Sequence, residues 1–296
     1  MSLLSVGDRV QISDAKGNKH TIVLEVGKEF HTHKGGIPHD DILGKPEGSI
    51  VSSTNGTNYM VLRPLLLDHI LAMPRGAAVI YPRDSAQIIV EADIFPGAVV
   101  VEAGVGSGGL SSYLLRAIGH EGFLHSFERR DDFAATAKKN VLSYFPSEPT
   151  NWNITVGDLQ VAAFEQTQLH GTVDRIVLDM LAPWECMDIA KLLLKPGGVL
   201  CVYVATTTQM SRTAETMRLH QSWTEPRAWE SMVRGWHLEG LSVRPEHRMV
   251  GHTGFLMTTR RLADGVTPLQ KRSKPAPGAY GPDWTPPEIT TGTTQI

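Results

Sequence analysis

A glycine-rich segment has the clearest chemical use in this sequence. It reads EAGVGSGGL over residues 102–110 and lies between an apolar strand pattern at 98–103 and an amphipathic helix pattern. Glycine permits positive φ and lets a ligand approach backbone that a Cβ would block. We therefore predict a ligand-binding loop, formed by Gly104, Gly106, Ser107, Gly108, Gly109 and Leu110.

The spacing of this loop admits two kinds of nucleotide cofactor. Gly104, Gly106 and Gly109 satisfy the G-x-G-x-x-G pattern of dinucleotide-binding proteins. Glu102, two residues before the first glycine, suits the amino-acid end of S-adenosylmethionine, directly or through the loop. A carboxylate at position 102 would be unfavourable for a dinucleotide, because the pyrophosphate is also negatively charged. The loop favours S-adenosylmethionine, and an NAD(P)-dependent oxidoreductase is the alternative.

Two more carboxylates extend the cofactor hypothesis. Glu128 ends the next strand pattern, about 20 residues beyond the loop, where an acid accepts both ribose hydroxyls. NAD enzymes also bind the ribose hydroxyls with an acid at this position. Asp158 ends the third strand pattern, where it can accept from the adenine amino group, and a KPGG turn at 195–198 is common in methyltransferase folds. The plain alternative is that Glu102 and Asp158 only cap strand ends.

Three residues are candidates for contact with a target base. Asp179 closes the fourth strand pattern, which places it at the carboxyl edge of a parallel sheet beside the cofactor crevice. Its alternative role is a helix N-cap near Pro183. Tyr81 follows a short strand around Val79 and precedes a helix that we expect Asp84 to cap. Tyr203 lies near the end of the fifth strand pattern, and core packing is the alternative for both tyrosines.

The surrounding pattern predicts the elements that must hold these residues. Residues 1–63 read as short strands of a small β-barrel-like domain, and 64–265 alternate buried strands with helices, as in a Rossmann-like sheet covered on both faces. The predicted strands are 98–103, 123–128, 152–156, 175–180 and 199–205. Residues 236–262 are expected to close the sheet as an antiparallel hairpin, and 266–296 are a Pro/Gly/Thr-rich flexible tail.

Composition limits the class of protein. The formal net charge is -3, and the two cysteines predict neither a disulfide framework nor a metal site. No apolar run approaches the ~20 residues of a membrane span, so we expect a cytoplasmic protein. His31, His33 and His39 lack the spacing of zinc ligands and are interpreted as exposed turn residues.

Four segments together resemble one known family. They are YPRD at 81–84, EAGVGSGGL at 102–110, LDMLAPW at 178–184 and RPEHRMVGHTGFL at 244–256. Their order is similar to that of the tRNA (adenine-N1)-methyltransferases that modify adenosine 58 in the T-loop, the actinobacterial members in particular. In one departure from many nucleic-acid amino-methyltransferases, three residues separate Asp179 from Pro183 and Trp184.

The resemblance implies a class I methyltransferase fold, S-adenosylmethionine as cofactor, the tRNA T-loop as partner, a homotetramer and no metal. It implies that a flipped adenine binds beside Asp179 and between Tyr81 and Tyr203. From their positions in the sequence, Gln87 is a candidate for the methionine end of the cofactor, with an exposed helix residue as the alternative, and Phe133 is a candidate for one adenine face, with core packing as the alternative. His252 is expected to hold the long hairpin. Phosphate contacts are expected from the C-terminal basic residues, namely Arg244, Arg248, Arg260, Arg261, Lys271, Arg272 and Lys274.

Two other functions stay open on the same fold. A non-catalytic RNA-binding subunit would be expected to lose the glycine loop or Asp179, and this chain has both. A protein carboxyl methyltransferase shares the style of the loop but not the YPRD and LDMLAPW segments.

Overall fold

The computed structural model describes residues 3–76, 78–145 and 147–269, which form two compact units, Met1–Pro74 and Arg75–Ile296. The strongly polar tail predicted at 266–296 falls outside the described residues from 270 onward. In the described part of the chain, no helix is both long and apolar enough to span a bilayer.

The first unit is built on a four-stranded antiparallel sheet of order β2-β1-β6-β5. Alternate side chains of its strands are buried, as the pattern of β6 shows, and they pack around a core that includes Val10, Ile12 and Val61. The strands are β1 (Arg9–Ser13), β2 (Lys19–Val23), β5 (Ile50–Ser52) and β6 (Asn58–Leu62), with a separate pair formed by β3 (Glu29–Thr32) and β4 (Gly35–Pro38).

This unit extends past the predicted boundary at Arg63. Helix α1 (Leu66–Ala72) belongs to it, with Leu66 and Ile70 buried and Asp68 paired with Lys19 of β2 at 2.8 Å. A short 3-10 turn, η1 (His39–Asp41), buries His39, whose Nδ1 accepts a hydrogen bond from the Glu25 amide at 3.1 Å. The prediction that His39 is exposed is therefore wrong.

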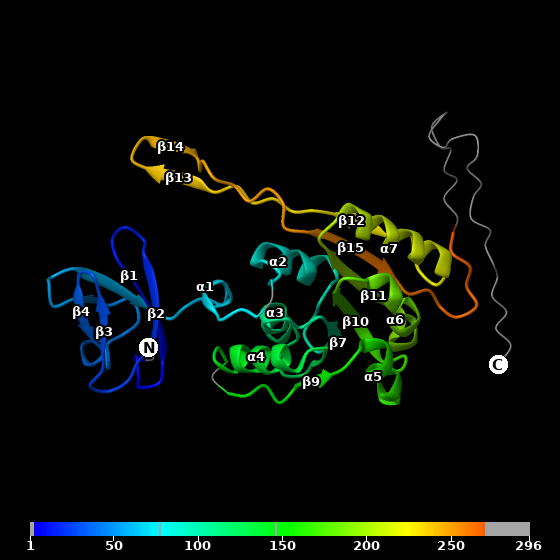
Figure 1. Ribbon diagram of the computed structural model, residues 1–296, viewed down its shortest axis with the longest axis horizontal. Helices are drawn as coiled ribbons and strands as arrows, with labels where there is room; N and C mark the ends of the chain where they lie inside the picture. The colour runs from blue at the N-terminus through cyan, green and yellow to red at the C-terminus, as the bar shows by residue number, and fades with distance from the viewer. Residues whose placement is uncertain (1–2, 77, 146, 270–296) are drawn as a thin grey trace. The chain divides into compact units, whose positions relative to one another are not determined.

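The second unit contains a seven-stranded sheet of order β12-β15-β11-β10-β7-β8-β9 (Figure 1). The five predicted strands are present and pair in parallel, and their apolar runs are covered on both faces. They are β7 (Val99–Ala103), β8 (Phe123–Glu128), β9 (Trp152–Val156), β10 (Val173–Asp179) and β11 (Leu194–Val204). The predicted Rossmann-like sheet is confirmed.

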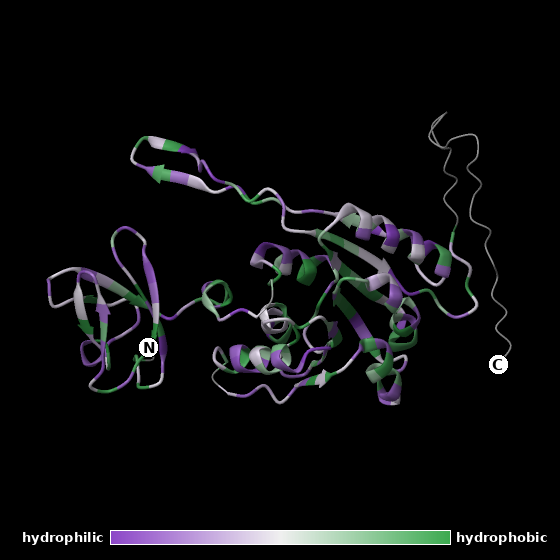
Figure 2. Cartoon of the chain, viewed as in Figure 1, coloured by the Kyte–Doolittle hydropathy of each residue, from purple (hydrophilic) through white to green (hydrophobic). Residues whose placement is uncertain are grey.

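Helices cover both faces of this sheet and enclose two apolar clusters. One cluster includes Leu114 and Ile88, and the other includes Ile189 and Met217. Figure 2 shows hydrophobic colouring on much of the central sheet and hydrophilic colouring along exposed helix faces such as that of α7. The helices are α2 (Pro82–Glu91), α3 (Gly109–Ile118), α4 (Asp131–Leu142), α5 (Leu159–Glu165), α6 (Met187–Leu193) and α7 (Thr207–His220), with the 3-10 turns η2 (Thr167–Leu169) and η3 (Pro183–Cys186).

Two predictions about the sheet are wrong. Residues around Val79 and Ile80 form no strand. Residues 236–262 do not form one hairpin: β15 (Phe255–Arg260) pairs antiparallel with β11, and β12 (Arg227–Trp229) lies beyond it. The strands β13 (Trp236–Glu239) and β14 (Ser242–Pro245) pair only with each other among the described strands. Their side chains are largely exposed, whereas those of β15 are buried against the sheet.

Candidate active site

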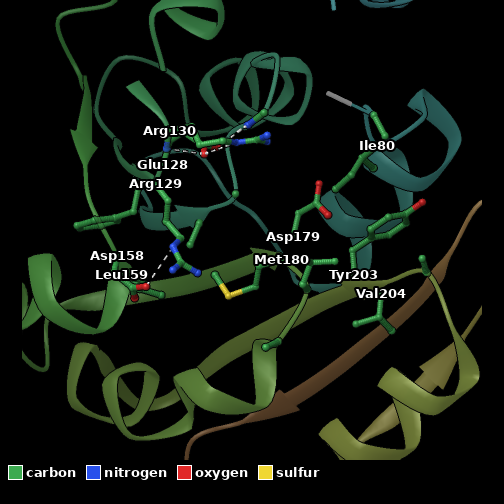
Figure 3. A pocket seen from close by; sticks show the side chains of 18 of the residues that line it. Ile80, Glu128, Arg129, Arg130, Asp158, Leu159, Asp179, Met180, Tyr203 and Val204 are labelled. Carbon is green, nitrogen blue, oxygen red and sulfur yellow. Dashed lines mark hydrogen bonds and ion pairs between the residues drawn. The ribbon is translucent and has the colours of Figure 1, made fainter. Parts of the chain in front are cut away.

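A cavity of about 770 Å³ opens at the carboxyl edge of the parallel strands (Figure 3). Parallel α/β sheets place ligand sites at this edge, because the strand ends and their following loops converge there. The ends of β7, β8, β10 and β11 all contribute to its wall. The cavity includes six of the predicted site residues, namely Gly104, Gly106, Glu128, Asp158, Asp179 and Tyr203.

The glycine loop lies directly against the end of β10. Gly104 has φ +89°, and a Cβ placed on it would lie 1.7 Å from the carbonyl oxygen of Asp179. Only glycine fits this close approach of two backbones. The start of the loop is therefore packed on the end of β10, and Gly104 and Gly106 also line the cavity.

Glu128 ties this loop to the end of β8. Its Oε2 accepts a hydrogen bond from the Gly106 amide at 3.0 Å, and its Oε1 accepts one from the Arg130 amide at 3.1 Å. The side chain is almost fully buried yet borders the cavity. A carboxylate held at both oxygens is pre-oriented, and each oxygen retains further lone pairs for ligand hydroxyls.

Glu102 lies beneath the loop and not in the cavity wall. Its Oε2 accepts hydrogen bonds from the hydroxyls of Ser111 at 2.7 Å and Ser126 at 2.8 Å. Its Oε1 has no partner among the residues that the structure describes. Burial raises the pKa of Glu102 to about 7, against the opposing effect of the two hydroxyls. Of the two modes that the sequence suggests, this position favours action through the loop.

Asp158 combines two roles that the sequence left as alternatives. It is the N-cap of α5, and its Oδ1 accepts from the Gln160 amide at 3.1 Å. The same carboxylate lies 3.3 Å from Nε of Arg129 and lines the cavity. Capping and an accessible acceptor are therefore compatible in one side chain.

Asp179 and Tyr203 lie close together at the other end of the cavity (Figure 3). They are register partners on β10 and β11. Burial, and to a lesser degree the negative charge of Glu128, raises the pKa of Asp179 to about 7. Burial, with added effects of Asp84 and Asp179, raises the pKa of Tyr203 to about 12, so its phenol is neutral and donates to the Thr253 carbonyl at 2.9 Å.

The other predicted site residues are near the cavity but do not line it in the described structure. The hydroxyl of Ser107 accepts from the Gly76 amide and its carbonyl accepts from Asn140, which anchors the loop from behind. The Phe133 ring lies under the Arg130 guanidinium, 3.2 Å from ring centroid to Cζ. Their direct ligand contact stays a prediction, as does that of Tyr81, Gln87, Glu102, Gly108, Gly109 and Leu110.

Sequence reasoning missed several residues of the wall. Arg129 and Arg130 follow Glu128 directly, and Gln209 lies in the first turn of α7, shortly after β11. Gln209 forms a capping box with Thr206, and its Nε2 donates to the Leu181 carbonyl at 2.9 Å. The Thr-x-x-Gln pattern after a predicted strand was the available signal.

The structure also corrects two assignments outside the cavity, those of Asp84 and Arg261. Asp84 does not cap α2, because its carboxylate bonds Ser231 and Thr253. Arg261 is buried and paired with Asp264, so it is not a phosphate contact, and Lys271, Arg272 and Lys274 fall outside the described residues.

His252 bonds the Glu230 carboxylate at 3.0 Å and the Ala205 carbonyl at 3.4 Å, which agrees with its predicted structural role. Within the described ranges, no three His, Cys, Asp or Glu side chains form a possible metal-binding group.

Comparisons with known proteins agree with this geometry. A family model described as "tRNA methyltransferase complex GCD14 subunit" matches residues 60–243, and a "TrmI-like N-terminal" model matches residues 3–51. The TrmI tRNA (adenine(58)-N(1))-methyltransferase of Thermus thermophilus is 34% identical over 250 residues, which cover 84% of this chain and 95% of the relative. The tRNA (adenine(57)-N(1)/adenine(58)-N(1))-methyltransferase TrmI of Methanocaldococcus jannaschii is 30% identical over 83% of this chain and 93% of the relative.

Solved structures lead to the same family. A SAM-dependent O-methyltransferase from Thermotoga maritima superposes with a TM-score of 0.81 at 30% identity, covering 88% of this chain and 95% of that one. The tRNA (m1A58) methyltransferase TrmI of Aquifex aeolicus superposes with a TM-score of 0.77 at 25% identity, covering 88% and 100%. The chain belongs to the GCD14 family of tRNA methyltransferases, which includes the TrmI tRNA (adenine-58-N1)-methyltransferases.

Proposed function

We infer that this protein is a methyltransferase that transfers the methyl group of S-adenosylmethionine to N1 of adenosine 58 in the T-loop of tRNA. The observation that carries this inference is the partly buried Asp179 carboxylate in the same cavity as the Gly104 loop, in a chain that matches tRNA (adenine-58-N1)-methyltransferases over most of its length. The Rossmann-type alternative that uses NAD(P) leaves this match unexplained.

The cavity fits the cofactor at both ends. Gly104 and Gly106 line the cavity, and the Glu128 carboxylate is fixed by the Gly106 amide at a position suited to the ribose hydroxyls. Asp158 supplies an acceptor for the adenine amino group. The cofactor supplies an electrophilic methyl group on a sulfonium. Its positive charge suits a cavity that Glu128, Asp158 and Asp179 make acidic.

The protein residues then need only hold the base and stabilise charge. Adenine N1 carries its own lone pair, so no strong base must act before transfer. As the N1 bond forms, the ring becomes cationic, and the Asp179 carboxylate in the cavity wall is placed to stabilise that charge. Tyr203, and Tyr81 at the outer side, provide aromatic surface for a base that has left its stack.

We also propose a homotetramer. Support comes from the β13–β14 hairpin, whose apolar side chains lie in solvent in the single chain, with Leu238 74% exposed. Figure 2 shows hydrophobic segments on both strands of this hairpin. Exposed apolar patches of this kind mark association surfaces. Light scattering on wild type and on a Leu238→Arg variant tests the proposal, and a wild-type monomer contradicts it.

A cytoplasmic location follows from the proposed substrate, because tRNA is modified where it is made and used. Both cysteines, Cys186 and Cys201, are free and buried, which suits a reducing compartment.

The function is tested by incubating the protein with labelled S-adenosylmethionine and unmodified tRNA. Nucleoside analysis should show 1-methyladenosine, and a transcript in which position 58 is not adenosine should accept no label there. Label in protein, or at oxygen in the RNA, contradicts the function. A protein that binds tRNA and transfers nothing would be the non-catalytic subunit.

A further inference from the structure

The YPRD segment holds a carboxylate for which the proposed chemistry has no use. Asp84 lies in the first turn of α2 and is fully buried. Its Oδ1 accepts a hydrogen bond from the Ser231 hydroxyl at 2.8 Å, and its Oδ2 accepts one from the Thr253 hydroxyl at 2.6 Å. Ser231 precedes β13 and Thr253 follows β14, so one side chain holds both ends of the segment that carries the hairpin.

Arg83 completes this connection. Its Nη1 donates to the Val250 carbonyl at 2.7 Å, and its Nη2 donates to the Thr253 hydroxyl oxygen at 3.0 Å. The Thr253 hydroxyl therefore accepts from Arg83 and donates to Asp84. A hydroxyl with both roles filled by charged partners has a fixed orientation.

Thr253 reaches the proposed base pocket from behind. It lines the cavity, and its carbonyl accepts the hydrogen bond from the Tyr203 phenol at 2.9 Å. A Cβ on the next residue, Gly254, would lie 2.4 Å from Cζ of the Tyr203 ring, so backbone packs directly against that ring. Residues 253 and 254 thus define both the position of the ring and the direction of its hydroxyl.

We propose that Asp84 is a positioning residue for methyl transfer, which fixes Thr253 and, through the hydrogen bond from the Tyr203 hydroxyl to the Thr253 carbonyl, holds Tyr203 in the wall of the base pocket. The inference rests on the proposed function, because it assigns Tyr203 to the wall that receives the target adenine. Asp84 touches neither base nor cofactor in this assignment. Its contribution is to hold the pocket in one geometry before the base enters, and misplacement of a reacting group by ~1 Å is enough to cost ~10²-fold in rate.

The first test compares Asp84→Asn with Ser85→Ala. Ser85 is the next residue on the same helix, is equally buried, and its hydroxyl has no partner among the described residues. The Asp84→Asn change keeps the shape of the side chain but replaces one acceptor oxygen with a donor that faces a hydroxyl. We expect the single-turnover methylation rate of Asp84→Asn to fall roughly 10- to 100-fold. The dissociation constant of S-adenosylhomocysteine should not change, and Ser85→Ala should match wild type in both measurements.

A purely structural role and the proposed positioning role of Asp84 predict different methylation rates when Asp84→Asn is combined with Tyr203→Phe. If Asp84 acts through the Tyr203 hydroxyl, Tyr203→Phe removes the hydrogen bond through which it acts. In the Tyr203→Phe background, Asp84→Asn should therefore lower the methylation rate by less than about 3-fold. Equal loss in both backgrounds, or a rate of Asp84→Asn within about 3-fold of wild type, overturns the proposal.

Thr253 provides a second test that avoids a change at the buried carboxylate. Thr253→Ser retains the hydroxyl and should retain most of the rate. Thr253→Val keeps the shape without the hydroxyl, and its methylation rate should fall as that of Asp84→Asn does. Equal rates for the two variants contradict the proposal. If wild type itself forms no 1-methyladenosine, the proposed function has failed; if wild type is active and these variants are too, only the positioning role has failed.

Discussion

Gly104 and Asp179 are in such close contact that a single methyl group on Gly104 would lie 1.7 Å from the Asp179 carbonyl oxygen. The first residue of the cofactor loop and the acid proposed to face the base are therefore parts of one packed junction. Neither can shift without the other. This junction sets the distance between the two ligand sites through backbone and not through flexible side chains.

Replacement of Gly104 tests this junction, and Gly97 offers a matched control. Both have the same left-handed backbone, with φ of +89° and +90°, but no described atom lies within 4 Å of the Cβ position of Gly97. Gly97→Ala should lose only the conformational term of roughly 1–2 kcal/mol in unfolding free energy. Gly104→Ala should lose more than that and also lose binding of S-adenosylhomocysteine, as measured by calorimetry. Equal behaviour of the two variants would show that the contact is unimportant.

Glu128→Gln tests the proposed ribose contact. The variant keeps one acceptor oxygen for the Gly106 or Arg130 amide and removes the charge that strengthens hydrogen bonds to ligand hydroxyls. Affinity for S-adenosylhomocysteine should fall by roughly 10- to 100-fold, which corresponds to about 1.5–3 kcal/mol. NAD should bind neither protein in the same titration. Detectable NAD binding by wild type would revive the oxidoreductase alternative.

The second unit and its ligand edge were predictable because local sequence determines them. The apolar runs of β7, β8 and β10 are long enough to be buried on both faces, and parallel connection places their last residues at one edge. The sequence therefore predicts that Glu128, Asp158 and Asp179 share one ligand site, and all three line the same cavity.

Long-range packing explains what the sequence did not reveal. Asp84 has the position and residue type of a helix cap, and only the folding of residues 231 and 253 onto it gives the carboxylate other partners. Arg261 looks like a phosphate contact until Asp264 pairs with it. The hairpin prediction failed for a similar reason, because β11 offers a free edge that β15 alone occupies.

The exposed arginines of the predicted set remain candidates for RNA contact, namely Arg244 and Arg248 of the hairpin segment and Arg260, which also donates to the Gly197 carbonyl at 2.9 Å. Arg244 and Arg248 are exposed, whereas Arg218 on α7 is paired with Glu215 and Glu225. Replacing Arg244 and Arg248 with alanine should weaken tRNA binding and reduce the slope of log affinity against log salt by about 2, one for each lost phosphate contact. Arg218→Ala should leave the slope unchanged. A wild-type slope in the double variant would remove these two residues from the interface.

Glu102 should make the unfolding free energy depend on pH. Its pKa is 4.5 in the unfolded chain and about 7 in the folded protein, so the folded state holds its proton more tightly. The stabilisation is fully present below pH 4.5 and is lost as pH rises to about 7, on the order of 3 kcal/mol. Glu102→Gln is uncharged at this position throughout and should show a smaller decline, because the part that comes from Asp179, whose pKa is also raised to about 7, remains in both proteins. Urea unfolding of both proteins at pH 5 and pH 8 measures the difference, and parallel profiles would contradict it.

Asp179→Asn separates a catalytic carboxylate from a structural one. The N-cap of η3 is Ala182 and no side chain caps this turn, so the alternative role of Asp179 as a helix cap near Pro183 is wrong. Asn retains the shape and one acceptor oxygen, so a purely structural role predicts near-normal activity. If the carboxylate stabilises the cationic ring, loss of its charge should lower the single-turnover rate on the order of 10²-fold or more, with folding and tRNA binding little changed.

The pH profile gives a second and independent measurement. Because the pKa of Asp179 is raised to about 7, the carboxylate is the minor form below that pH, and the wild-type rate should rise as pH increases from 5 to 8. A bound sulfonium favours the carboxylate, so at saturating cofactor the inflection should lie at or below pH 7. The residual rate of Asp179→Asn should show no such rise, because an amide does not titrate. A variant rate within a few-fold of wild type, or a variant that keeps the wild-type inflection, would exclude Asp179 as the group that stabilises the methylated ring.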